Sequence, residues 1–341
     1  MQNDKLYMQR CIQLASQGRG FVAPNPMVGA VIVHNDLIIG EGYHQQYGEA
    51  HAEVNAINSV KNTSLLIDST IYVSLEPCAH FGKTPPCVNL IVKTKFKRVV
   101  IGSLDPNPDV DGKGVSILEM ANIEVTKGVL EKECKELNKH FFISHKTKRP
   151  FVFLKWAQTS NKLMNDDFKQ SWISCPEAQT VVHSWRSEHQ AIMVGRKTIE
   201  SDNPSLTVRR VKGKNPIRIV IDPNLSLKND FKIFNKDSKT IIINLIKNKI
   251  EGDIQFVQLE KIDTVSILDL LYKLDIQSVL IEGGKETLQS FIDSNLWDEA
   301  KVITSPKTFI FGTPSPEITT KQTSSSLFFD DTITHYINKN S

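Results

Sequence analysis

Apolar residues along the chain recur with two periods, one typical of helices and one typical of strands. Spacings of three and four residues predict a helix over 4–16, which Gly18 ends. Short runs of β-branched and aromatic residues predict buried strands at 28–33, 70–75 and 98–102. Because helices and strands alternate through this half, we expect a three-layer α/β/α arrangement.

The second half of the chain repeats the alternation over a longer stretch. A mainly parallel sheet is expected, since strands separated by helices are joined by crossover connections. The tail at 312–326 is rich in Thr, Ser and Pro and is predicted to be an exposed loop. The predicted strands are 151–157, 191–195, 217–222, 240–245, 254–259, 278–281 and 332–337, and the predicted helices are 176–188, 265–274 and 285–290.

A basic stretch at 139–150, which ends in a proline, separates the two halves. A helical segment precedes it and a strand follows it, as is typical of a domain boundary, and we interpret it as a solvated connector. A chain of 341 residues also favours two domains over one. We therefore predict domains at 1–145 and 146–341.

Composition and charge narrow the class of protein. Lys and Arg exceed Asp and Glu by only 41 − 38 = 3, so we expect no nucleic-acid partner. No run approaches the ~20 apolar residues of a membrane span, and the N-terminus lacks the apolar run of a signal peptide. We therefore expect no membrane association and a cytoplasmic location. The five cysteines are interpreted as reduced, with Cys11, Cys134 and Cys175 as packing residues or as residues without a role.

The strongest chemical signal lies between His51 and Cys87. A His-Ala-Glu sequence that ends at Glu53 is followed by a Pro-Cys pair at Cys78 and then by Cys87. One imidazole and two thiolates are typical donors for catalytic zinc, and three protein ligands leave a fourth position for water. Zinc lowers the pKa of that water from about 16 to about 7. Glu53 is then available to move protons between the water and a substrate nitrogen.

The geometry of this motif sets one condition. His51 and Glu53 are two residues apart, so they point to different sides of a helix. Both reach one site if it lies beyond the helix N-terminus, where free backbone N–H groups also favour an anion. His80 as a fourth ligand would close the open position, so we assign it to a loop. A structural zinc site would need four protein ligands, so the pattern favours catalysis.

The spacing of the cysteines carries a family resemblance. Eight residues separate Cys78 from Cys87, and the segment EPCAHFGKTPPC resembles the deaminase half of the bifunctional riboflavin-biosynthesis deaminase–reductase family. The segments FLKWAQTSN, SWISCPEA, HSWRSEHQAIMVG, SDNPSLTVR and VLIEGGKETLQSF look like its reductase half. The chain departs from the family at Ala50, where Pro is usual, at Asn161-Lys162, where Asp-Gly is usual, and at Gln170, where Ser is usual.

This resemblance implies a cytidine-deaminase-like α/β/α domain followed by a dihydrofolate-reductase-like α/β domain. It implies one zinc ion per chain on His51, Cys78 and Cys87, with Glu53 as the catalytic group, and NADPH as the second cofactor. The implied reactions are hydrolytic deamination of 2,5-diamino-6-ribosylamino-4(3H)-pyrimidinone 5′-phosphate, and then reduction of the ribosyl side chain to ribityl.

The resemblance also implies contacts in detail. Strand, Gly-Gly and helix around Gly284 form an arrangement that can bind a pyrophosphate, although no Gly-x-Gly-x-x-Gly motif is present. The implied cofactor residues are Ala157, Trp172, Thr198, Asp202, Gly284, Lys285, Glu286, Thr287, Leu288, Gln289 and Ser290. The implied substrate residues are Asn25, His44, Lys155, Gln170, Arg186, Leu206, Arg209 and Glu282.

Five of the substrate residues have a plainer alternative that the sequence leaves open. Asn25 lies between two prolines and can stabilise a turn, and His44 can be a surface residue or a phosphate contact. Arg186 and Arg209 can grip a phosphate or form surface ion pairs. Lys155, inside an apolar strand, can polarise the reacting sugar or be a structural lysine with a partner.

The sequence is also compatible with a different function, a nucleoside or RNA-base deaminase with a C-terminal binding module. That function predicts aromatic platforms beside a basic groove. Aromatic residues make up only 8% of the chain and the net charge is near neutral, so we rank it second. Whether the chain forms a homo-oligomer is left open.

Overall fold

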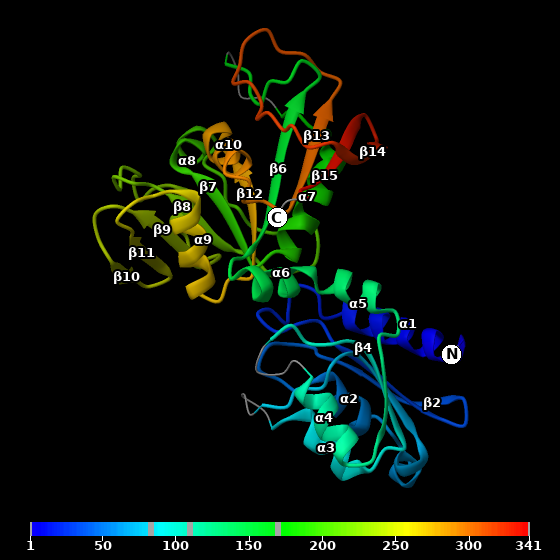
Figure 1. Cartoon of the computed structure of the whole chain (residues 1–341). Coiled ribbons are helices and arrows are strands. Elements are labelled where there is room, and N and C mark those ends of the chain that lie inside the picture. The colour runs from blue at the N-terminus through cyan, green and yellow to red at the C-terminus, as the bar shows by residue number, and fades with distance from the viewer. Residues whose placement is uncertain (1, 81–84, 108–111, 168–171, 340–341) are drawn as a thin grey trace. The chain divides into compact units, whose positions relative to one another are not determined.

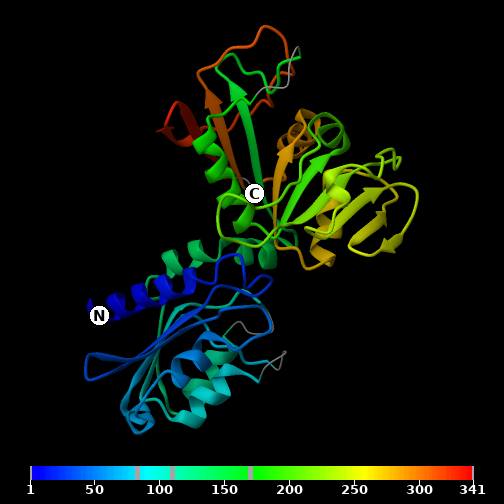
Figure 2. The same ribbon diagram turned by 180° about the vertical axis from the view of Figure 1, so that it is seen from behind.

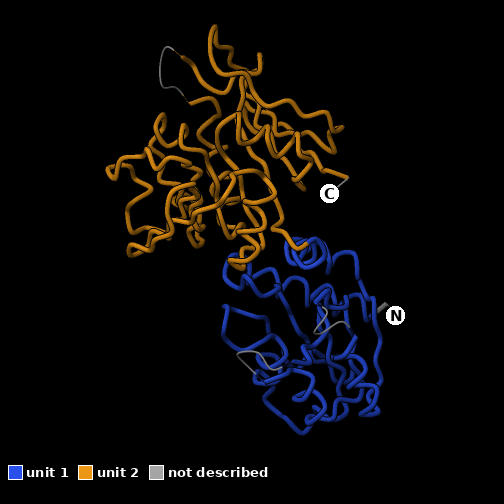
Figure 3. The backbone as a smooth tube through the Cα atoms, turned by 60° about the vertical axis from the view of Figure 1, so that its left-hand side comes forward, with its two compact units in different colours: residues 1–147 blue, residues 148–341 orange. Residues whose placement is uncertain are grey.

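The computed structural model of the chain describes residues 2–80, 85–107, 112–167 and 172–339. Two compact units, residues 1–147 and 148–341, make up the chain (Figure 3). The boundary expected from the sequence, between 145 and 146, falls within helix α6 (Lys139–Thr147). Each unit has its own sheet and its own buried hydrophobic residues.

The first unit contains a five-stranded sheet of mixed direction. β1 pairs antiparallel with β2 and with β3, whereas β3, β4 and β5 are parallel. The β1–β2 hairpin turns at Asn35 and Asp36, which have positive φ (48° and 61°), as tight hairpins require. In sheet order the strands are β2 (Leu37–Tyr43), β1 (Gly29–His34), β3 (Thr70–Leu75), β4 (Arg98–Ser103) and β5 (Glu124–Lys127) (Figure 1).

Helices cover both faces of this sheet. Successive strand residues point to opposite faces, so neighbouring residues of one strand belong to different cores. Ile32 and Val73 belong to a core shared with α2, α3 and α4. Val31 and Tyr72 belong to a second core shared with α1 and α5. The predicted three-layer arrangement is confirmed. The helices are α1 (Gln2–Ser16), α2 (Ala52–Asn58), α3 (Cys87–Thr94), α4 (Lys113–Met120) and α5 (Glu131–Leu137), with a 3-10 helix, η1, at Thr63–Asp68.

The segment expected to be a solvated connector is instead helical. α6 buries Phe141 and Ser144. Asn138, just before it, is also buried, and its amide group bonds the backbone N–H and C=O of Met27 at 2.8 Å each. The basic composition of the segment favoured a solvated connector in the prediction, but the segment forms a helix with one buried face.

The second unit contains a ten-stranded sheet whose centre is parallel, as predicted. The parallel strands run from β11 to β13 in sheet order, and β10, β14 and β15 add antiparallel edges. In that order the strands are β10 (Lys249–Glu251), β11 (Ile254–Gln258), β9 (Thr240–Asn244), β8 (Ile217–Ile221), β7 (Ala191–Gly195), β12 (Ser278–Gly283), β6 (Phe151–Thr159), β13 (Glu299–Ser305), β15 (Asp331–Ile337) and β14 (Gln322–Phe328).

Helices lie on both faces of the second sheet as well (Figure 2). Leu154 of β6 belongs to the core that contains residues of α9 and α10. Its neighbour Phe153 points to the other face, where its ring lies 5.9 Å from that of Trp185 of α7. The helices are α7 (Pro176–Glu188), α8 (Arg196–Asp202), α9 (Thr264–Lys273) and α10 (Lys285–Asp293), with a 3-10 helix, η2, at Lys232–Phe234.

The tail differs from the prediction. The sequence indicated an exposed loop through residue 326, but β14 begins at Gln322 and pairs antiparallel with β15. All but the last residue of β14 are exposed, and its serines show no apolar alternation. An edge strand of this composition leaves no hydrophobic period in the sequence.

Candidate active sites

The first candidate site brings His51, Cys78 and Cys87 together from three elements. His51 caps the N-terminus of α2, Cys78 lies in the turn after β3, and Cys87 is the first residue of α3. His51 Nδ1 lies 3.3 Å from the Cys87 sulfur and 3.6 Å from the Cys78 sulfur. Tetrahedral zinc with bonds of about 2.0 Å to N and 2.3 Å to S needs N···S separations of about 3.5 Å. The donor set therefore fits zinc.

The electrostatics of the three donors also favour a cation. The backbone N–H of Cys87 donates to the Cys78 sulfur at 3.3 Å. Hydrogen bonds from Cys87 and from His51 lower the pKa of Cys78 to about 4, although burial opposes them. The resulting thiolate raises the pKa of the Cys87 thiol beside it. A divalent cation at the centre would relieve the repulsion between two thiolates and release the second proton.

Glu53 lies beside these donors but supplies none of the three ligand atoms. It is in the first turn of α2, where its side chain is only 3% exposed. Burial, together with the negative charge of the Cys78 sulfur, raises the pKa of Glu53 to about 7. A carboxyl group with that pKa exchanges protons readily near neutral pH.

Asn25 and His44 form a pair next to the zinc donors. The Asn25 amide nitrogen lies 3.1 Å from His44 Nε2, and His44 Nδ1 lies 3.1 Å from the carbonyl oxygen of Ala50. A carbonyl can only accept, so Nδ1 carries the proton and Nε2 accepts from Asn25. The His44 ring is buried, 5.2 Å from the ring of His51.

Glu76 has a structural role that the sequence did not indicate. Its buried carboxylate accepts hydrogen bonds from the backbone N–H groups of Asp105 (3.3 Å), Gly112 (3.1 Å) and Val115 (3.2 Å). These bonds tie the segment after β4 and the start of α4 to the turn that carries Cys78. Partners of this kind are backbone groups far away in sequence, so no motif spacing shows them.

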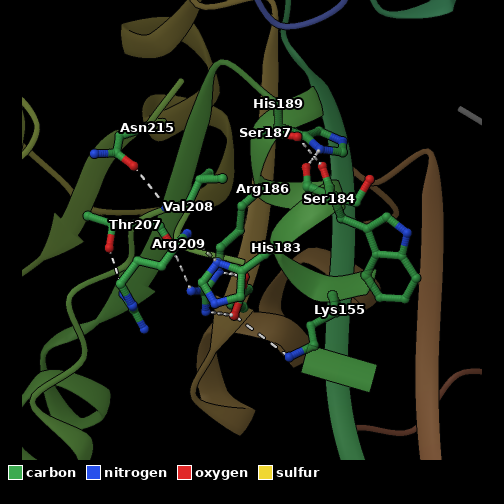
Figure 4. Close-up of polar contacts among 12 residues, drawn as sticks. Lys155, His183, Ser184, Arg186, Ser187, His189, Thr207, Val208, Arg209 and Asn215 are labelled. Carbon is green, nitrogen blue, oxygen red and sulfur yellow. Dashed lines mark hydrogen bonds and ion pairs between the residues drawn. The ribbon is translucent and has the colours of Figure 1, made fainter. Parts of the chain in front are cut away.

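The second candidate site is a buried charged cluster in the other unit (Figure 4). Arg186 of α7 binds Glu282 of β12 through two bonds, Nε to Oε1 at 2.6 Å and Nη2 to Oε2 at 2.8 Å. Lys155 Nζ of the adjacent strand β6 lies 3.7 Å from Glu282 Oε2. Burial opposes ionisation of Glu282, but the charges of Arg186 and Lys155 outweigh it and lower its pKa to about 2. Burial lowers the pKa of Lys155.

The segment after α8 joins this cluster. Arg186 Nη1 donates to the carbonyl oxygen of Thr207 at 3.2 Å, and Arg209 Nη1 donates to Thr207 Oγ1 at 2.6 Å. Leu206, which directly precedes Thr207, is buried and has a positive φ of 52°. Arg186, Leu206, Arg209, Lys155 and Glu282, all predicted as substrate residues, therefore lie in one place.

A backbone arrangement that could cradle a phosphate lies where β7 and β12 end. Gly195 precedes α8 and Gly284 precedes α10. A Cβ on Gly283 would lie 2.9 Å from the Thr198 side chain, and Gly284 has a φ of +76°, so the backbone passes closely only without side chains. The N-terminal N–H groups of α10 add an anion-binding end, so these residues fit a dinucleotide pyrophosphate.

The remaining predicted cofactor residues lie on several elements of the second unit. Thr198 and Thr287 lie against the glycines of the cradle, whereas the Leu288 side chain is buried in the core and leaves only its backbone for a ligand. Trp172 is 73% exposed, and its carbonyl oxygen accepts from Lys307 Nζ at 2.7 Å. Gln170 lies outside the described residues. Lys285, Glu286, Gln289 and Ser290 continue α10, Asp202 ends α8, and Ala157 is on β6.

The first unit has a zinc donor set beside a buried glutamate, which is typical of a deaminase. The second unit has glycines that could cradle a phosphate and a buried Lys–Glu–Arg cluster, which suit a reductase. Together they indicate a deaminase joined to a reductase. The comparisons with known proteins agree. Residues 1–103 match the family described as cytidine and deoxycytidylate deaminase zinc-binding region, and residues 150–336 match the RibD C-terminal domain. The chain belongs to the RibD family of riboflavin biosynthesis proteins.

Individual relatives cover nearly all of the chain. It is 41% identical to the riboflavin biosynthesis protein RibD of Aquifex aeolicus over 312 residues, which are 89% of this chain and 87% of the relative. The Bacillus amyloliquefaciens RibD is 38% identical over 327 residues, 92% and 87% of the two chains. A Thermotoga maritima crystal structure, a diaminohydroxyphosphoribosylaminopyrimidine deaminase/5-amino-6-(5-phosphoribosylamino)uracil reductase, has 35% identity and a TM-score of 0.90 over 99% of both chains. Both predicted domain folds are confirmed.

Proposed function

We propose that this chain catalyses two consecutive steps on a pyrimidine ribosyl phosphate in riboflavin biosynthesis. The first is hydrolytic deamination of 2,5-diamino-6-ribosylamino-4(3H)-pyrimidinone 5′-phosphate, and the second is reduction of the ribosyl side chain to ribityl. The proposal rests above all on the joint presence of a zinc donor set with Glu53 and a buried Lys155–Glu282 pair in one chain of the RibD family.

In the deaminase unit, His51, Cys78 and Cys87 hold the metal. Bound zinc makes hydroxide available from water at neutral pH. Glu53 takes the proton that the water loses and passes it to the ring nitrogen of the pyrimidine. It then helps to protonate the amino group, which leaves as ammonia while a carbonyl forms at C2. Burial raises the pKa of the Glu53 carboxyl, which suits a group that both takes and gives a proton.

Asn25 is placed to bind the pyrimidine in this unit. His44 holds the Asn25 amide from one side, so the amide has a fixed orientation next to the metal donors. We keep His44 as a proposed substrate contact. Its ring sits between Asn25 and the Ala50 carbonyl, which makes orientation of Asn25 its first role.

In the reductase unit, NADPH supplies a hydride for C1′ of the ribose. As the C1′–O4′ bond breaks, its electron pair moves to O4′, which needs a proton. Lys155 is the proposed donor, because it is buried and held against Glu282. Arg186 keeps Glu282 ionised, so Glu282 in turn keeps Lys155 oriented.

Substrate and cofactor phosphates are assigned to different ends of this unit. Arg209, with Arg186 and Leu206, is proposed to bind the 5′-phosphate of the substrate. The glycine cradle, with Thr198 and the residues from Gly284 to Ser290, is proposed to bind the pyrophosphate of NADPH. Ala157, Trp172 and Asp202 are proposed to contact the rest of the cofactor, and Gln170 the substrate.

Product analysis tests the function directly. Wild-type chain with zinc, NADPH and the diamino substrate is expected to release one ammonia and oxidise one NADPH per substrate. Lys155→Met should stop at the deaminated intermediate, whereas the exposed-site control Lys212→Met should complete both steps. Ammonia release that does not depend on zinc would contradict the deaminase assignment.

The expected partner is this small molecule. Among the described helices, none has the length and hydropathy of a membrane span. The absence of a nucleic-acid partner, the cytoplasmic location and the state of association stay predictions.

A further inference from the structure

His183 is a buried histidine of the charged cluster. It is not among the substrate or cofactor residues that the family resemblance implies. It lies on α7, one turn before Arg186, and is 5% exposed. Its Nδ1 accepts the backbone N–H of Arg209 at 3.1 Å. A ring nitrogen that accepts an N–H carries no proton, so the imidazole is neutral in this arrangement.

The surrounding charges keep the ring neutral. Burial lowers the pKa of His183, and Arg186, Arg209 and Arg210 lower it further, to about 4, against the opposing charge of Glu282. His183 therefore stays neutral, and an acceptor at Nδ1, at neutral pH.

Three consecutive residues after Leu206 each have a backbone group that is hydrogen-bonded to a side chain from elsewhere in the unit. The carbonyl of Thr207 accepts from Arg186 at 3.2 Å, the N–H of Val208 donates to Asn215 Oδ1 at 2.8 Å, and the N–H of Arg209 donates to His183 (Figure 4). The segment follows a residue with positive φ, so local conformational preference does not hold it in place.

We propose that His183 is a positioning residue of the reductase, which fixes Arg209 for the phosphate of the substrate. This inference rests on the proposed function. The Arg209 backbone is held by His183, and its guanidinium is held by Thr207 at 2.6 Å. Burial and then the charge of Arg186 lower the pKa of the Arg209 guanidinium, so Arg186 is near enough to act on it, and two guanidinium groups can meet one phosphate.

Loss of the Nδ1 acceptor should act on binding. A displacement of about 1 Å in a substrate-positioning group costs up to about 100-fold. We expect His183→Leu to raise KM for the phosphorylated substrate about 10- to 100-fold, with kcat changed less than about 3-fold. Inhibition of the reductase by inorganic phosphate should weaken in parallel.

Two amide variants separate positioning from simple packing. In His183→Asn the amide oxygen occupies nearly the place of Nδ1 and can accept the same N–H, so KM should stay near that of wild type. In His183→Gln the amide lies near the place of Nε2, too far along the side chain, so KM should rise as in His183→Leu. The comparison of Asn with Gln holds even if the leucine variant folds poorly.

A substrate without its 5′-phosphate gives the decisive comparison. If His183 acts through Arg209 on the phosphate, His183→Leu and wild type should reduce the dephosphorylated substrate equally well, and Arg209→Ala should mask the effect of His183→Leu. Equal losses with both substrates, or an Asn variant as defective as the Leu variant, would overturn the proposal. Tryptophan fluorescence during urea unfolding controls for folding of the second unit, because all four tryptophans lie in it. Wild-type NADPH oxidation tests the proposed function separately.

Discussion

The two sites of this chain are built in opposite ways. The zinc donors come from one continuous stretch, between His51 and Cys87, and lie at the ends of three neighbouring elements. The reductase cluster combines Lys155 of β6, Arg186 of α7 and Glu282 of β12. The first site needs a metal cation from outside the protein, whereas the protein itself supplies both signs of charge in the second, two cations around one carboxylate.

This difference has an energetic consequence. Two thiolates side by side repel each other without a cation, so the first site depends on metal. Glu282 is balanced by Arg186 and Lys155 in the folded unit itself, and removal of one member leaves a buried charge without its partner. Damage to the first site should therefore remove an activity, and damage to the second should remove both an activity and stability.

The largest expected effect is on the metal. Cys87→Ala removes one of three ligands, so zinc content and deaminase activity should both fall to background, because hydroxide is no longer supplied at neutral pH. Reductase activity with the deaminated intermediate should be unchanged. Cys134→Ala, a buried thiol of the same unit outside the donor set, is the matched control. Normal zinc content in Cys87→Ala would contradict the assignment of Cys87 as a zinc ligand, and with it the contrast between the two sites.

The next effect concerns proton donation in the reductase. Lys155→Met should lower kcat about 10²- to 10⁴-fold. The lysine must be protonated to donate, and burial places its pKa below the ordinary value of about 10.4. Activity should therefore fall as the pH rises through that lowered pKa. Lys155→Arg should retain some activity without this alkaline decline, and an unchanged decline in the arginine variant would exclude Lys155 as its source.

Glu282→Gln tests the balance of charges. It leaves Arg186 and Lys155 buried beside a neutral amide, so we expect a loss of about 3–5 kcal/mol in the free energy of unfolding of the second unit. The four tryptophans all lie in residues 148–341, so tryptophan fluorescence during urea unfolding reports this unit alone. A loss below about 1 kcal/mol would mean that the Glu282 carboxylate does not stabilise the two buried cations beside it.

The smallest effect should come from Glu76. Glu76→Ala removes three backbone contacts near Cys78 but no ligand, so deaminase activity should fall about 10- to 100-fold, as for other groups that orient metal ligands. Glu76→Gln keeps an acceptor and should lose less. Zinc titration of both variants would show whether the loss lies in metal affinity or in turnover.

The same contrast explains how far the sequence could predict each site. The zinc ligands and Glu53 were predictable, because the types of donor and their spacing are typical of zinc deaminases. The predicted ends of the helices and of the strand also bring these residues to one place. Lys155 was also noticeable, as a lysine inside an apolar strand. His183 and Glu76 were not, since each acts on a backbone N–H that no side-chain pattern marks.

The same reasoning explains which elements of the fold could be predicted from the sequence and which could not. The helix α7 was predicted with its observed bounds, because Pro176 and the apolar spacing mark it. β14 was missed because an exposed edge strand of serines has no hydrophobic period. The helix after Asn138 was not predicted, because only two of its nine residues, Phe141 and Ser144, are buried, and so few leave no clear apolar stripe.

Removal of the metal from the wild-type chain tests the independence of the two sites most directly. Chelator-treated chain would be given, in separate reactions, the diamino substrate and the deaminated intermediate, with NADPH oxidation followed in both. We expect no oxidation with the first and full oxidation with the second, and recovery of the first on addition of zinc. A parallel loss of reduction of the intermediate would contradict two separately built sites.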